Sequence, residues 1–156
     1  MIAAIRPSGT SCLSARCPAT ALGGLRQSIC TNVQRKGIPW VAETFEIVDF
    51  AALPGIACPC GTARRGLMES ESVPYSLHVT EISANARTHY HKRLTETYFI
   101  LECDEDAALE LNGEVIPVQP RQAVVVHPGT RHRAVGKMTV IIVASPKFDP
   151  ADEWFD

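Results

Sequence analysis

Residues 89–96 read His-Tyr-His-Lys-Arg-Leu-Thr-Glu and bring two histidines and a carboxylate into a short span of the chain. On a β-strand, residues i and i+2 project to the same face. His89 and His91 are therefore predicted to present two imidazoles to one side of a strand. Glu96 opens the next apolar, aromatic run, and a strand that begins there carries Glu96 and Tyr98 on a common face.

A second histidine-bearing stretch ends 41 residues after His91 and reads Val124-Val125-Val126-His127-Pro128-Gly129-Thr130-Arg131-His132. Its Pro-Gly pair predicts a turn after a strand, and His132 follows that turn. Three neutral imidazoles and one carboxylate can bind a divalent transition metal and leave positions open for water or substrate. Spacing alone leaves open the alternative that these are ordinary surface or core histidines.

The chain from Trp40 onward is predicted to be all-β. Asn112-Gly113 is a strong hairpin signal because both residues accept positive φ. Spacing of about 8 to 15 residues between the predicted strands favours an antiparallel sandwich or barrel. Asp149–Glu153 predicts one helical turn, and prolines at 54, 59 and 74 predict loops before the first clear strand. The predicted strands are residues 76–82, 97–101, 107–111, 114–118, 123–126 and 139–143.

Together, the two histidine stretches resemble the two motifs of the cupin superfamily, and the hairpin lies between them as in that family. The likeness covers about residues 71–156, including the tail Phe148–Trp154, which is similar to the tails of small single-domain cupins. It implies a jelly-roll (cupin) β-barrel of antiparallel strands. Carried over residue by residue, it also implies the metal ligands His89, His91, Glu96 and His132.

The chain departs from the usual cupin motifs at four positions. Cys103 stands where a glycine usually follows the strand of the first motif. Arg121 replaces the glycine that opens the second motif, Gln122 replaces a common aspartate, and His127 replaces the first proline of the turn. None of these changes removes an implied ligand. They concern the tightness of two turns.

The resemblance is more specific for fold than for activity, because the superfamily includes dioxygenases, isomerases, decarboxylases and non-enzymes. We expect one divalent transition metal per chain, with Fe, Mn, Ni, Zn and Cu not distinguished. The first expected activity is that of a dioxygenase-like oxidoreductase acting on a small molecule, and the second is that of an isomerase. Tyr98 is expected to face the cavity, where it could hydrogen-bond a substrate or only pack. The alternatives are a non-catalytic metal- or small-ligand-binding module and a purely structural barrel.

Several other residues have both a functional and an ordinary interpretation. Cys58-Pro59-Cys60-Gly61 could bind a second metal or undergo reversible oxidation, but a simple turn is favoured. Arg64-Arg65 could bind an anion, and a solvated loop is favoured. His78 is predicted to be a hydrogen-bonded core histidine, and residues 102–106 a solvated acidic turn. Arg131 and Arg133, which flank His132, are assigned to the surface.

Charge divides the chain into two parts. Residues 1–42 contain five Lys and Arg and no acid, whereas the remaining 114 residues hold all 17 acids against 10 Lys and Arg. We predict a basic leader over residues 1–38 and a barrel domain over 39–156, with the motifs in 71–147. The leader resembles an organelle transit peptide in composition. A disordered tail or a start codon placed too far upstream is favoured over a transit peptide.

The net charge of -2 gives no indication of nucleic-acid or membrane binding. The longest aliphatic stretch, Met138–Ala144, is far shorter than the roughly 20 residues that cross a bilayer. Six cysteines without regular spacing favour a reducing, cytoplasmic compartment, with organelle targeting as the eukaryotic alternative. The resemblance to small cupins implies a homodimer, which would also cover an exposed sheet edge.

Overall fold

The structure is a computed structural model that describes residues 40–42, 45–58, 60–83 and 85–156. The predicted leader, residues 1–38, lies outside the described residues. Nearly all of the regular secondary structure in the described residues is β-strand. Its strands are β1 Trp40–Ala42, β2 Phe45–Ile47, β3 Ile56–Cys58, β4 Gly61–Gly66, β5 Ser76–Ile82, β6 Thr95–Cys103, β7 Ala108–Leu111, β8 Glu114–Pro117, β9 Ala123–Val126, β10 His132–Val135 and β11 Met138–Ser145, and its one short helix is the 3-10 turn η1 Pro150–Asp152. No helix in the described residues is both long and apolar enough to cross a membrane.

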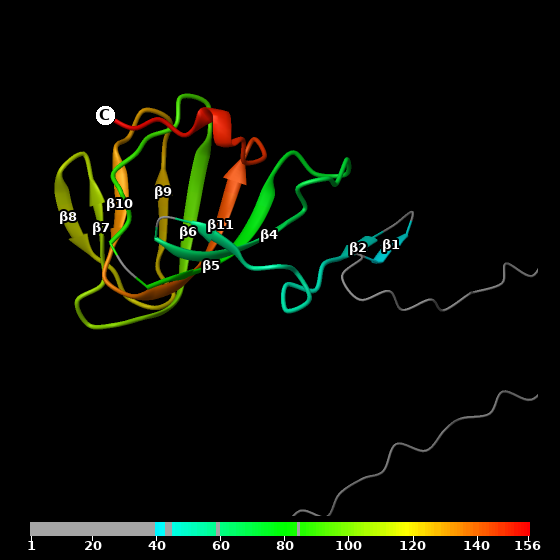
Figure 1. The fold of residues 1–156 in the computed structure, drawn as a ribbon, viewed down its shortest axis with the longest axis horizontal. Helices are drawn as coiled ribbons and strands as arrows, with labels where there is room; N and C mark the ends of the chain where they lie inside the picture. Colours follow the sequence, from blue (N-terminus) through cyan, green and yellow to red (C-terminus); the bar gives the residue numbers. More distant parts are fainter. Residues whose placement is uncertain (1–39, 43–44, 59, 84) are drawn as a thin grey trace, which may run out of the picture. The chain divides into compact units, whose positions relative to one another are not determined.

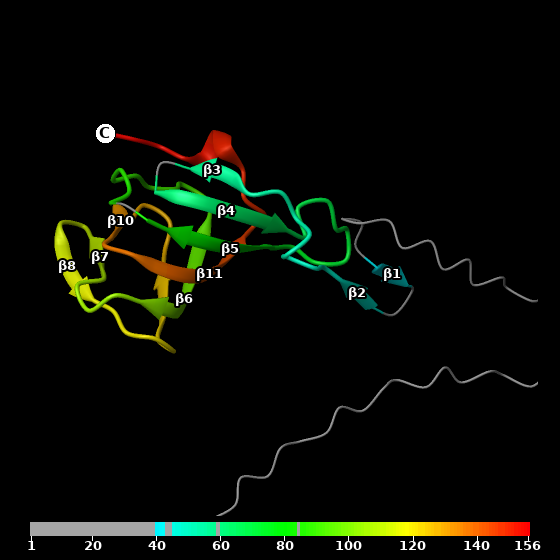
Figure 2. The ribbon, with the colours of Figure 1, turned by 60° about the horizontal axis from the view of Figure 1, so that its bottom comes forward.

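Two antiparallel sheets form the barrel. The larger has the order β3-β4-β5-β11-β6-β9, and the smaller has the order β10-β7-β8. In both ribbon views the smaller sheet lies at one side of the larger one (Figures 1 and 2). The jumps in strand order, such as β11 between β5 and β6, are the crossovers of a jelly roll. The predicted all-β, jelly-roll barrel is confirmed.

The core follows from strict alternation along the central strands. On β11, Met138, Val140, Ile142 and Ala144 are buried, and the residues between them face the other side of the sheet. Ile142 pairs with both His78 and Tyr98, so one inward row of side chains crosses three strands. Val140 is fully buried, and complete burial of such a side chain stabilises the fold by roughly 1.5–3 kcal/mol.

Two turns show how the chain accommodates its unusual residues. Asn112 and Gly113 adopt φ of 50° and 87° between β7 and β8, which confirms the predicted hairpin. Arg121 adopts φ of 73° where cupins usually have glycine. The backbone keeps its left-handed turn despite the side chain, because Arg121 N–H donates to the carbonyl of Ile100 at 2.8 Å.

Two expectations about local structure were wrong, and one hairpin was not predicted. This hairpin is β3–β4, in which Cys58 pairs with Gly61, and it lies between the loops at Pro54 and Pro74. Arg64 and Arg65 lie within β4, not in a solvated loop, because β4 pairs along its whole length with β5. His89 forms a single isolated β-bridge rather than belonging to a regular strand. The predicted helical turn is confirmed as η1, with Asp149 as its N-cap.

Candidate metal centre

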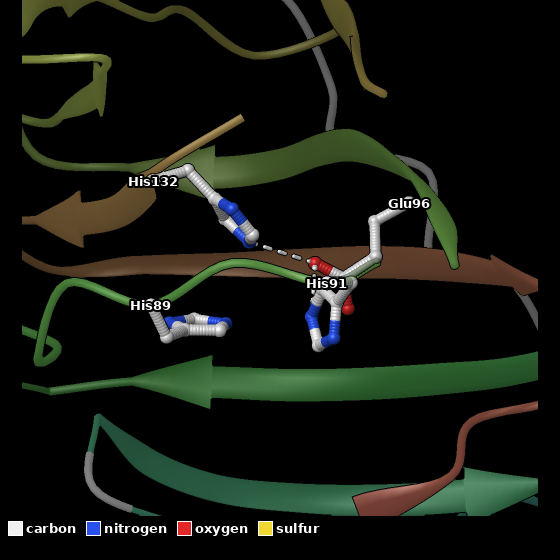
Figure 3. A group of neighbouring side chains, drawn as sticks. All are labelled: His89, His91, Glu96 and His132. Atoms are coloured by element: carbon white, nitrogen blue, oxygen red, sulfur yellow. Dashed lines mark hydrogen bonds and ion pairs between the residues drawn. The ribbon is translucent and has the colours of Figure 1, made fainter. Parts of the chain in front are cut away.

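Four side chains predicted from the sequence converge between the two sheets. Each offers one donor atom, and these atoms all lie within 4.8 Å of one another. Figure 3 shows the imidazoles and the carboxylate directed towards a common point. They come from the segment after β5, from β6 and from the first residue of β10, and they are His89, His91, Glu96 and His132.

Backbone pairing brings the two histidine stretches together. The N–H of His89 donates to the carbonyl of His132 at 3.1 Å, and the N–H of His132 donates back to His89 at 2.8 Å. The N–H of Gly129, in the turn before β10, donates to the carbonyl of His91 at 2.6 Å. These bonds fix the second motif against the first, so the site is held by main-chain geometry.

Each histidine is oriented by a backbone carbonyl. His89 Nδ1 lies 3.0 Å from the carbonyl oxygen of Arg87, His91 Nδ1 lies 2.8 Å from that of Asp152, and His132 Nδ1 lies 3.0 Å from that of Thr130. A carbonyl can only accept a hydrogen bond, so each Nδ1 carries the proton. In the neutral ring, Nε2 then has a free lone pair for a metal. On His132 this atom hydrogen-bonds to the Glu96 carboxylate at 3.0 Å, so His132 must release its Nε2 proton before it binds an ion.

The chemistry of this donor set fits a mononuclear metal ion. His91 Nε2 is buried and has no hydrogen-bond partner among the described residues. It lies 3.7 Å from Glu96 Oε2, too far for a hydrogen bond, and His132 Nε2 lies 3.0 Å from the same oxygen. A buried polar atom without a partner is costly, and a cation between these atoms would satisfy it. Three imidazole nitrogens and one carboxylate suit a divalent transition metal.

Burial and mutual contacts shift the pKa values of Glu96, His132 and His89. Burial opposes ionisation of Glu96, but the hydrogen bond and charge of His132, with the nearby His91 and His89, hold the pKa of Glu96 below its usual value. Burial also disfavours protonated His132, yet its contact with Glu96 raises the pKa of His132. Burial and the neighbouring His132 lower the pKa of His89. The carboxylate is therefore charged, and His89 favours its neutral, metal-binding form.

Comparison with known proteins agrees with the two motifs and the barrel. No family model matches the chain. It is 30% identical over 87 residues to the L-ectoine synthase of Shouchella clausii (strain KSM-K16). The matched region is 54% of this chain and 65% of that protein, just under two thirds of its length. A solved structure of a protein from Planctomyces limnophilus is 41% identical, with a TM-score of 0.67 over 70% of this chain and 95% of that one. The chain belongs to the cupin superfamily.

Another solved cupin structure resembles this one in fold alone. Pac13 from Streptomyces, described as a nucleoside dehydratase, is 16% identical, with a TM-score of 0.59 over 69% of this chain and 91% of that one. At this identity the likeness concerns the barrel and not the reaction.

Tyr98 faces the interior of this cupin, as predicted. Its hydroxyl donates to Glu96 Oε2 at 3.1 Å, two residues away on the same face of β6. Burial, then the charge of Glu96, raises the pKa of Tyr98 well above its usual value. Tyr98 is therefore a neutral hydrogen-bond donor that holds the carboxylate in place.

Asp152 is a supporting residue that sequence reasoning missed. Its buried carboxylate accepts hydrogen bonds from the backbone N–H groups of Lys92, Arg93 and Leu94 at 3.0–3.2 Å. Its own carbonyl accepts the Nδ1 proton of His91. Although its burial opposes ionisation, the three N–H donors hold the pKa of Asp152 below its usual value. One residue of the tail thus fixes the loop between two candidate ligands.

The cysteine pair lies at the β3–β4 hairpin, where a turn was predicted. Cys58 Sγ and Cys60 Sγ are 3.1 Å apart, and both side chains are partly buried. Burial, together with the hydrogen bond and charge of Cys58, raises the pKa of Cys60 to about 12. Cys60 is thus a protonated thiol packed against the core, which agrees with the ordinary interpretation.

The remaining expectations are met or refined. His78 is buried and hydrogen-bonded to Ser76, as predicted for a core histidine. Arg131 is exposed and pairs with Asp156, whereas Arg133 is only partly exposed and pairs with Glu110. The acidic stretch 102–106 is exposed apart from Cys103. In the described residues, a cavity of about 590 Å³ lies elsewhere, against β4 and the segment after it, and none of the four converging residues lines it.

Proposed function

We propose that this protein is a mononuclear-metal enzyme that acts on a small molecule, with the metal held by His89, His91, Glu96 and His132. The observation that carries the proposal is the common orientation of the three imidazoles. Each Nδ1 is committed to a backbone carbonyl, and each Nε2 is directed at the others within 4.8 Å. Structural histidines have no need of this shared arrangement, and a metal centre requires it.

The residues at this centre would have different roles. A divalent metal in this site would act as a Lewis acid on a bound oxygen, or would activate O₂ if it were Fe(II). The four ligands leave two positions of an octahedron for substrate or water. Glu96 keeps its negative charge close to the ion, and Tyr98 fixes the orientation of that carboxylate. The barrel interior limits the substrate to one small molecule.

Two reaction classes follow from this proposal. The name of the relative that is 30% identical, a synthase, supports a non-redox reaction in which the metal assists proton transfer, and isomerisation belongs to the same class. Dioxygenase-like oxidation stays a prediction, because three histidines and a carboxylate with open positions also suit iron. Oxygen consumption during turnover separates the two classes.

The proposal is tested by metal content and turnover together. Purified protein is analysed for metals and assayed with panels of hydroxy acids, amino-group-bearing acids, nucleosides, thiols and diketones. We expect one metal ion per chain and turnover that His91→Ala abolishes. His127→Ala is the matched control, because His127 is exposed and lies outside the converging group. Stoichiometric metal without turnover of any panel member, but with saturable ligand binding, would favour a non-catalytic module.

A further inference from the structure

A second carboxylate lies beside the four proposed ligands, on the C-terminal tail. Glu153 Oε1 is 3.8 Å from Nε2 of His89, the atom of that ring that is free to bind a metal. The separation nearly equals the 3.7 Å between Glu96 and His91 across the site. The Glu153 side chain is 28% exposed, against 7% for Glu96. Glu153 therefore lies on the more open side of the group, next to His89.

The backbone holds Glu153 in this position from both sides. Asp152, before it, is fixed by three N–H donors of the loop that follows His91. Trp154, after it, forms a reciprocal pair with Tyr90, with both hydrogen bonds at 2.9 Å. A residue between two such anchors has little freedom to move away from His89.

The carboxylate of Glu153 has no competing partner in the described part of the chain. Among the ionisable groups there, it approaches only His89. Asp149 and Asp156, two other acids of the tail that are more exposed, pair with arginines instead. A carboxylate held near one metal-binding nitrogen, without a cation of its own, is placed to bind the ion that this nitrogen binds.

We propose that Glu153 is a fifth, exchangeable oxygen donor of the metal centre. This inference rests on the proposed metal function and extends it from three nitrogens and one oxygen to three nitrogens and two oxygens. A second carboxylate favours cations that prefer oxygen ligands and higher coordination, such as Mn²⁺, over tetrahedral Zn²⁺. Because Glu153 lies on the exposed side, it is the donor that an incoming substrate would replace.

The test is metal binding by the full-length, metal-free protein. Wild type, Glu153→Gln and Glu153→Asp are titrated with MnCl₂ and with ZnCl₂ by calorimetry, and the bound Mn²⁺ is recorded by electron paramagnetic resonance. We expect Glu153→Gln to weaken Mn²⁺ binding about tenfold or more, to weaken Zn²⁺ binding less, and to change the Mn²⁺ spectrum. Glu153→Asp keeps the charge on a shorter side chain and should fall between the two.

Asp156→Asn is the matched control, since it removes a carboxylate from the same tail at a residue that pairs with Arg131. It should bind both metals as wild type does. Thermal unfolding of the metal-free variants shows whether the tail remains folded. Unchanged Mn²⁺ affinity and an unchanged spectrum in folded Glu153→Gln would overturn the role of Glu153 and leave the proposed function intact. Failure of wild type to bind either metal would instead overturn the proposed function itself.

Discussion

At the scale of single residues, His78 links a buried hydrogen bond to the pH dependence of stability. Ser76 Oγ accepts the N–H of Phe148 at 3.0 Å and lies 3.0 Å from His78 Nε2, so its hydroxyl proton is free to donate to a neutral imidazole. Burial, and then the charge of Arg65, lowers the pKa of His78 to about 4. The pKa of a histidine in the unfolded chain is about 6.5. Between pH 6.5 and pH 4, His78 is therefore protonated in the unfolded chain but neutral in the folded protein.

The stabilisation from neutral His78 is therefore complete above pH 6.5 and is lost as the pH falls towards 4. Between pH 7 and pH 5 we expect His78 to account for a loss of about 2 kcal/mol in the free energy of unfolding. Urea unfolding of metal-free wild type and His78→Gln at both pH values measures it. Equal pH dependence of the two proteins would show that His78 is not the group responsible.

Asp152 gives a second prediction at this scale. Asp152→Asn keeps the size of the side chain but loses the negative charge that three N–H donors share. We expect a loss of about 1–3 kcal/mol in the free energy of unfolding and metal affinity about tenfold weaker, because His91 loses its fixed support. Glu114→Gln, an exposed acid on β8, should change neither quantity. Wild-type metal affinity in Asp152→Asn would contradict a positioning role.

These residues also show what the sequence could reveal about the site. The four candidate ligands were predictable because they lie in two short motifs with recognisable spacing. Asp152 contacts residues 58–60 positions away in the sequence. Glu153 reaches His89 only because the tail folds back over the barrel end. No local pattern marks such contacts, so both residues were predicted only as part of a helical turn.

At the scale of elements, the β3–β4 hairpin depends on Gly61. A Cβ built at Gly61 would lie 2.0 Å from the carbonyl oxygen of Glu81 on β5, and neither backbone can easily move within the sheet. We expect Gly61→Ala to cost at least about 2 kcal/mol in unfolding free energy. Gly113→Ala is the control, because its left-handed φ of 87° carries strain but no neighbour lies within 4 Å. Equal losses in chemical unfolding would show that the close approach is unimportant.

Element prediction from sequence worked where apolar residues alternate and failed where they do not. β5, β6, β7, β8, β9 and β11 all contain runs rich in aliphatic or β-branched residues, and each was found. β4 reads Gly-Thr-Ala-Arg-Arg-Gly and has no such pattern. Its partner β5 supplies the hydrogen bonds, and Arg64 gains an ion pair with Glu81 at 2.7 Å. Tertiary pairing therefore determines this strand more than local propensity does.

At the scale of the whole molecule, the outer face of the larger sheet carries an apolar patch on β6, β9 and β11. Phe99, Leu101 and Val125 are 38%, 39% and 51% exposed on neighbouring strands β6 and β9. Ile141 and Val143 continue the same face on β11 and are partly exposed. An apolar sheet face of this kind is typical of an interaction surface. We propose that two copies of the chain pair through it, in line with the homodimer expected from the cupin resemblance.

Light scattering with size exclusion tests this prediction. Wild type should have about twice the chain mass of 17.0 kDa, and the double variant Phe99→Lys with Val125→Lys should have the mass of one chain. Val115→Lys is the control, because Val115 is 55% exposed on β8 in the other sheet. A monomeric wild type, or a dimer that survives the double substitution, would contradict pairing through this face.

The most direct test of the account is the location of the metal. Crystals of the purified protein, grown without chelators, are measured at the absorption edge of the metal found by elemental analysis. The account predicts one anomalous peak per chain, about 2.0–2.2 Å from Nε2 of His89, His91 and His132 and from a carboxylate oxygen of Glu96. A metal-loaded protein with its peak at any other position, or with none of these atoms in contact with the ion, would contradict it.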